Sequence, residues 1–247
     1  MQTTRIASVV ILIMAAVYLT CRLVGKRNRL KNRAYDRNKD RLIRLHIAKR
    51  LEESAPIHLD LGDGGESGLA GGSVLAAAGA AETVSAQMAF ADEPWVVTAP
   101  GGFAVNTQKD AVRMGMSAAD YGSSYDSDFG AFTGVSSMSH LAGNAAVMEK
   151  EPSSLHLSVG SFGTAPALAD MLYANGEALC VGGDDLVSQA VAAVGADAVY
   201  VGEQYTEIPD ALDKTEKKNA ALLAMDVMRL IVIAALVIFA GLGLSGL

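Results

Sequence analysis

Four glycine-rich turns are the places where this sequence concentrates chemistry. They read LGDGG, APGGF, VGSFG and VGGDD, and each follows a short apolar run and precedes a helical stretch. Helix N-termini present free N–H groups to anions, and glycine allows the backbone to approach a ligand closely. The candidate ligand-binding residues are Gly62, Asp63, Gly64, Gly65, Gly101, Gly102, Gly160, Ser161, Gly163, Gly182, Gly183, Asp184 and Glu203. The alternative interpretation is that these are tight turns that need glycine for geometry alone, with Asp184 as a helix cap.

No complete catalytic or cofactor motif accompanies these turns. Gly62 and Gly64 fit the dinucleotide pattern G-x-G-x-x-G, but Ser67 stands at its third glycine. G-x-x-x-x-G-K-[ST], G-x-S-x-G and H-E-x-x-H are all absent. His140 could act as a base and Ser161 as a nucleophile, but nothing pairs them in the sequence, so His140 is interpreted as a surface or capping residue. The sequence therefore predicts no catalytic residue and no metal ligand, and it identifies no cofactor.

The turns separate alternating strands and helices. Strands are expected at 57–61, 95–99, 155–159, 178–181 and 197–202, while the stretch YGSSYDSDFGAFTG stays unassigned. Strands that alternate with helices pair in parallel, so residues 54–208 are predicted to form a layered α/β domain with a Rossmann-like parallel sheet. All four turns would then meet at the carboxyl edge of the sheet, where open α/β sheets bind their ligands.

Two apolar segments flank this domain, at 1–25 and 230–247, and both are predicted transmembrane helices. About 18–20 helical residues span roughly 27–30 Å, close to the thickness of the hydrocarbon core of a bilayer. A secretory signal is the alternative for the first segment. A retained anchor is favoured because a strongly basic stretch follows it. Residues 26–53 are expected to form a basic helical linker, and residues 209–229 a helix that leads into the second span.

The distribution of charge gives the expected orientation. The net charge is −7, yet thirteen of the twenty Lys and Arg residues lie within residues 1–50. The basic residues that flank the spans most closely are Arg22, Lys26, Arg27, Arg29 and Arg229. By the positive-inside rule both termini lie outside the cell (inner) membrane and the α/β domain is cytoplasmic. The basic segment would attract anionic lipid head groups. Nucleic acid is not expected as a partner, because the adjoining domain is acidic.

Three segments, VGSFG, YVGEQYTE and LLAMDVMRLIVIAAL, resemble an uncharacterised family of prokaryotic two-span membrane proteins. The matching positions are Gly160–Gly163, Gly202-Glu203, and Asp226 with Arg229. Gln204 stands where a second acidic residue would be expected. The resemblance implies an N-terminal span, a cytoplasmic α/β domain and a C-terminal span, and it implies no activity.

The leading functional hypothesis is a non-enzymatic, membrane-anchored assembly or scaffold protein. Its α/β domain would form a homo-oligomer or organise membrane protein partners. The alternative is a membrane-tethered sensory module that binds a nucleotide or metabolite at the glycine-rich loops. An enzyme of unknown reaction is a third hypothesis, and solute transport is disfavoured because the apolar runs 6–21 and 230–247 carry no charged residue.

Overall fold

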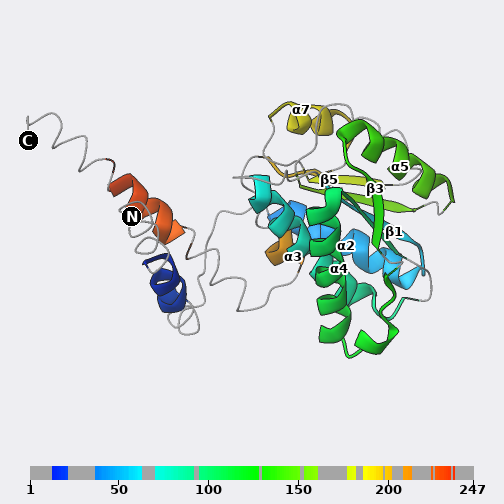
Figure 1. Cartoon of the computed structure of the whole chain (residues 1–247), viewed down its shortest axis with the longest axis horizontal. Helices are drawn as coiled ribbons and strands as arrows, with labels where there is room; N and C mark the ends of the chain where they lie inside the picture. Colours follow the sequence, from blue (N-terminus) through cyan, green and yellow to red (C-terminus); the bar gives the residue numbers. More distant parts are fainter. Residues whose placement is uncertain are drawn as a thin grey trace, which may run out of the picture. The chain divides into compact units, whose positions relative to one another are not determined.

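The structure is a computed structural model that describes residues 13–21, 37–62, 70–91, 95–127, 130–150, 153–160, 177–181, 186–196, 198–201, 208–212, 224, 226–234 and 236. It divides into two units. The terminal unit comprises Met1–Tyr35 with Lys214–Leu247, and the central unit comprises Asp36–Asp213. The central unit carries the sheet and the helices labelled in Figure 1.

A six-stranded parallel sheet forms the middle of the central unit, in the order β3-β2-β1-β4-β5-β6. The predicted parallel α/β domain is thus confirmed. The strands are β1 (Ile57–Leu61), β2 (Val96–Pro100), β3 (Gly130–Gly134), β4 (Leu155–Val159), β5 (Glu177–Val181) and β6 (Ala198–Val199). β1 and β4 have the bounds that the alternation of residues predicts, whereas β6 is shorter than expected.

Strand β3 forms in the stretch that the sequence left unassigned. Its sequence, GAFTG, has a glycine at each end and only one large apolar residue, so it has neither the length nor the pattern that indicates a strand. Among the described strands it pairs with β2 alone, at the edge of the sheet. Pairing with a preformed neighbour therefore creates this strand, and local propensity contributes little.

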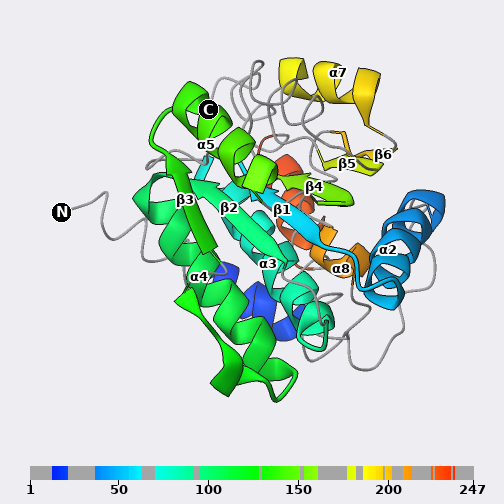
Figure 2. The ribbon, with the colours of Figure 1, turned by 90° about the vertical axis from the view of Figure 1, so that its right-hand side faces the viewer.

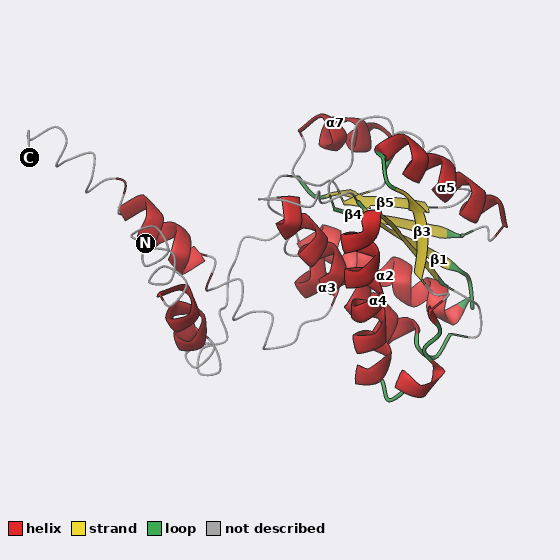
Figure 3. Ribbon diagram, in the orientation of Figure 1, coloured by secondary structure: helices red, strands yellow, loops and turns green. Residues whose placement is uncertain are grey.

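Helices cover the two faces of the sheet (Figures 1, 2 and 3). One face carries α3 (Ala70–Met88) and α4 (Gly101–Ala118), with α2 (Arg37–Glu52) and α8 (Ile208–Leu212) beside them. The other face carries α5 (Ser137–Lys150) and α7 (Leu186–Gly195). The chain builds β1, β2 and β3 outward in one direction, and α5 then returns it to β4 on the other side of β1. The strand order therefore reverses between β1 and β4.

The apolar core lies between the sheet and α3 and α4. Alternate residues of β1 point to this face, and Ile57, Leu59 and Leu61 are all buried there. Helix α2 adds Ile43 and Ile47 to the same core. The predicted linker at 26–53 does contain a helix, but that helix belongs to the central unit, whose boundary lies at Asp36.

The terminal unit contains helical residues at 13–21 and 226–234. Among the residues that the structure describes, no helix has both the length and the apolar character needed to cross a membrane. Much of the predicted spans at 1–25 and 230–247, and of the predicted helix at 209–229, lies outside the described residues. The described part of that helix at 208–212 is α8, which belongs to the central unit.

The packing of α3 against α4 depends on a glycine. A Cβ atom on Gly115 would lie 2.2 Å from the carbonyl oxygen of Glu82. We therefore expect Gly115→Ala to lower the free energy of unfolding by about 1–3 kcal/mol, because the helices must separate. Gly102→Ala, in the first turn of α4, meets no atom within 4 Å and should change it by less than about 1 kcal/mol. Denaturant unfolding of the full chain tests this, and equal losses in both variants would contradict it.

Candidate functional site

The sheet brings the described strand-end glycines to one edge. Gly62 follows β1, Gly160 follows β4, and Gly101 and Gly102 begin α4 directly after β2. Because these strands are parallel, all four glycines lie at the carboxyl edge, as the sequence predicts. The other candidate residues, Asp63, Gly64, Gly65, Ser161, Gly163, Gly182, Gly183, Asp184 and Glu203, lie outside the described residues.

The backbones of the two turns touch where the strand order reverses. The Gly62 N–H donates a hydrogen bond to the Val159 carbonyl at 3.0 Å. Gly160 has φ of +134°, and a Cβ atom there would lie 2.8 Å from the Gly62 nitrogen. Position 160 therefore requires glycine both for its backbone conformation and for this close approach.

A buried polar network lies on the sheet face opposite the apolar core. His58 and Asp60 alternate with the core residues of β1, so both point to this face. Backbone register places His156 and Ser158 of β4 beside them on one side, and Thr98 of β2 beside Asp60 on the other. All five side chains are at most 2% exposed. Three adjacent strands thus present a continuous polar strip within the domain.

Four hydrogen bonds connect these side chains in a row. Ser158 Oγ lies 2.8 Å from His156 Nε2, and His156 Nδ1 lies 2.7 Å from His58 Nδ1. His58 Nε2 lies 2.8 Å from Thr98 Oγ1, which donates to Asp60 Oδ1 at 3.3 Å. The row crosses three strands and ends on a carboxylate.

Helix α5 supplies two further hydrogen-bond partners of Asp60. His140 Nε2 lies 2.9 Å from Asp60 Oδ1, and Asn144 Nδ2 donates to Asp60 Oδ2 at 2.8 Å. The other ring nitrogen of His140, Nδ1, is hydrogen bonded to Thr133 Oγ1 of β3. The interpretation of His140 as a surface or capping residue is wrong, since it is 2% exposed. Helix α5 connects β3 to β4 across this face of the sheet. His140 and Asn144, in the first half of the helix, therefore lie over Asp60.

The sequence contains local signals for this network. IHLDL and LHLSV each place a histidine two residues before a second polar side chain, and the two segments pair in register. His140 and Asn144 are four residues apart, so they share a helix face. In isolation, an alternating strand is more often solvated on its polar side. The helix that covers this face is evident only from the sheet order, because α5 must pass over β1 and β2 to connect β3 with β4.

The network is arranged for hydrogen bonding. Among the described ranges, no group of three or more His, Cys, Asp or Glu side chains is placed to hold a metal ion. His58 and His156 each direct Nδ1 at the other ring, with the ring centroids 4.7 Å apart. Such a site can hold and transfer protons, because each imidazole has one nitrogen that donates and one that accepts.

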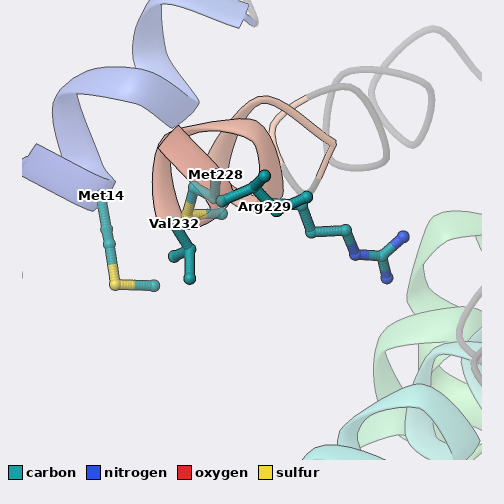
Figure 4. A pocket seen from close by; sticks show the side chains of 5 residues that line it. Met14, Met228, Arg229 and Val232 are labelled. Carbon is teal, nitrogen blue, oxygen red and sulfur yellow. The ribbon is translucent and has the colours of Figure 1, made fainter. Parts of the chain in front are cut away.

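The terminal unit has a small apolar pocket of about 440 Å³, lined by Met14, Met228, Arg229, Val232 and Ile233 (Figure 4). The predicted membrane-flanking residue Arg229 lies here and forms the ion pair with Asp226 that the spacing indicates, at 3.7 Å. Both side chains are partly exposed, at about 40%, so the pair contributes at most about 1 kcal/mol. The other flanking residues, Arg22, Lys26, Arg27 and Arg29, lie outside the described part of the chain.

Comparison with known proteins found no family model, no curated protein and no solved structure that matches this chain.

Removal of the Asp60 carboxylate should be strongly destabilising. We expect Asp60→Ala to lower the free energy of unfolding by roughly 3–5 kcal/mol, because three buried donors lose their acceptor together. Asp110→Ala removes an exposed carboxylate from α4 and should change it by less than about 0.5 kcal/mol. Denaturant unfolding monitored by circular dichroism measures both variants. A loss below about 1 kcal/mol for Asp60→Ala would contradict the central position of this carboxylate.

Proposed function

We propose that this protein is a membrane-tethered module that binds a small ligand at the carboxyl edge of β1, β2 and β4. The observation that carries the proposal is the reversal of strand order between β1 and β4. In open α/β sheets, ligands bind outside the carboxyl ends of the strands at such a reversal. Gly62, Gly101, Gly102 and Gly160 border this position. A Cβ atom on Gly101 or Gly102 would meet no atom within 4 Å, so there is room for a ligand near the backbone there.

A comparison of the two faces of the sheet supports a functional role for this half of the domain. Ile57, Leu59 and Leu61 fill the α3 face of β1 with apolar side chains. On the opposite face, the same strand buries a histidine and an aspartate. Burial of ionisable groups contributes less to stability than burial of apolar residues of similar volume. Stability alone therefore does not explain the polar strip, and a function of its side chains would explain it.

The proposed attachment to a membrane rests on the distribution of basic residues and on exposed apolar side chains. The basic residues that follow the first apolar segment favour an inner-membrane location, with both termini outside and the domain cytoplasmic. The described helical residues of the terminal unit expose many large apolar side chains, which acyl chains would cover. They are Ile13, Met14, Tyr18, Leu19, Leu230, Ile231, Val232, Ile233 and Leu236. Anionic lipid head groups would bind the basic segment.

Ligand-induced thermal stabilisation of the full chain tests the binding proposal. We expect one member of a panel of mono- and dinucleotides to raise the Tm, since a ligand at 100 times its Kd adds about 2.7 kcal/mol. Gly102→Phe should abolish this rise while leaving the unliganded Tm nearly unchanged, because a side chain there enters open space. Ala118→Phe is the control, because Ala118 is exposed at the other end of α4. This variant should keep the ligand-induced rise in Tm. If no panel member raises the Tm, a nucleotide ligand is excluded, and an equal rise in all three proteins would place the ligand elsewhere.

Self-association, as expected of a scaffold, is a second proposal, supported by exposed apolar residues in β3 and in the segment that follows it. Phe132, Val135 and Met138 are all more than half exposed, and β3 is an edge strand of the described sheet. Edge strands with exposed apolar residues pair readily with another chain. We expect native mass spectrometry of the full chain to give a discrete oligomer that Phe132→Glu dissociates. Phe103→Glu, on α4, is the matched exposed control. A wild-type monomer would refute the proposal.

A further inference from the structure

We propose that the row from Ser158 to Asp60 is a polarised proton relay that binds one proton, which enters at His156 Nε2. This goes beyond ligand binding and does not depend on it. The relay consists of Ser158, His156, His58, Thr98 and Asp60, joined by the four hydrogen bonds described above. Each hydroxyl has only one hydrogen to donate, and each neutral ring has one N–H. These limits determine where every proton lies.

The direction of the relay follows from Asp60. An ionised carboxylate can only accept, and Asp60 accepts from His140 and Asn144 as well as from Thr98. The Thr98 hydroxyl therefore donates to Asp60, and it can only accept from His58. His58 must then carry its hydrogen on Nε2, which leaves Nδ1 as an acceptor.

The remaining protons follow in the same way. Because His58 Nδ1 accepts, His156 must carry its hydrogen on Nδ1 to form the 2.7 Å bond between the rings. His156 Nε2 then carries no hydrogen, and it accepts from the Ser158 hydroxyl. If the hydrogen bonds ran in the opposite direction, Thr98 would donate to His58. Asp60 would then lose the Thr98 hydroxyl as a donor. Asp60 thus fixes the tautomers of two histidines on different strands.

The relay has room for one additional proton. A proton that binds at His156 Nε2 keeps the bond between the rings, and Ser158 turns its hydroxyl to accept. The charge can move on when the Nδ1 hydrogen of His156 passes to His58 Nδ1, which brings the positive charge nearer to Asp60. A second proton would place hydrogens on both Nδ1 atoms at 2.7 Å and break the bond. The pair therefore takes up one proton and not two.

Described titratable groups lie on the elements that pack against the relay. Asp60 and, from α5, His140 are in direct hydrogen-bond contact with its acidic end. Glu149 and Lys150 of α5 are exposed at the far end of that helix. On β5, Cys180 occupies the register position beside Ser158, and α7 contributes no titratable residue. Asp60 is thus the carboxylate that polarises the relay.

Nitrogen-15 NMR of the full chain, labelled in its histidine rings, tests the relay directly. At neutral pH we expect His156 as the Nδ1–H tautomer and His58 as the Nε2–H tautomer, each by roughly tenfold or more. On acidification the two rings should change together as they take up one proton. His46, on α2, provides an internal reference, and His46→Gln assigns its signals.

Thr98 provides the matched pair of variants. Thr98→Val keeps the shape and removes the hydroxyl, so we expect both tautomers of each ring to become populated within about threefold of one another. Thr98→Ser restores the hydroxyl and should restore the single tautomers, which loss of packing alone would not explain. Unchanged tautomers in a folded Thr98→Val would overturn the proposal. If that variant does not fold, the wild type decides, because a His58 Nδ1–H tautomer or uptake of two protons by the pair would overturn it equally.

Discussion

The burial of the Asp60 carboxylate is the constraint on which the arrangement of the polar face depends. A carboxylate removed from water is tolerated only when donors surround it, and here they come from two elements besides its own strand. Thr98 requires β2 to pair with β1 in the observed register, and His140 and Asn144 require α5 to cross this face. A shift of one residue in β1 would turn Asp60 into the apolar core. The carboxylate therefore specifies register and helix placement more than it adds stability.

Stability must come mainly from the opposite face. Small side chains on α3, such as Ala77, Ala80 and Ala81, are fully buried and allow close contact with the sheet and with α4. Apolar burial is non-directional, so it stabilises the layers without selecting a single register. The hydrogen bonds on the other face are directional and add that selection. The two faces thus contribute different properties to one fold.

Much of the fold was predictable from the sequence because its signals are local. Alternating runs at 57–61 and 155–159 and glycine-rich turns before helices indicate parallel strands without any tertiary information. β3 was not predictable, because its five residues form a strand only against β2. The network was not predictable either, since His58 and His156 are 98 residues apart and meet only through the β1–β4 register. In α2, the many basic residues masked the contribution of Ile43 and Ile47 to the core.

The proton relay and the glycine edge are close enough to affect each other through the backbone. Ser158 lies two residues before Gly160, and the Gly62 bond to Val159 extends the β1–β4 pairing past the network. Three of the four distances along the relay are 2.7–2.8 Å, and hydrogen bonds weaken quickly when such distances grow. A ligand that moved Gly160 and Ser158 together would change the length of the bond from Ser158 to His156. Conversely, a proton on His156 Nε2 would make the Ser158 hydroxyl, which lies beside this turn, accept a hydrogen bond where it had donated one. Binding free energies at two sites are reciprocally linked. If the charge of the relay changes the affinity of a ligand for this edge, binding of that ligand must change the affinity of the relay for a proton by the same factor.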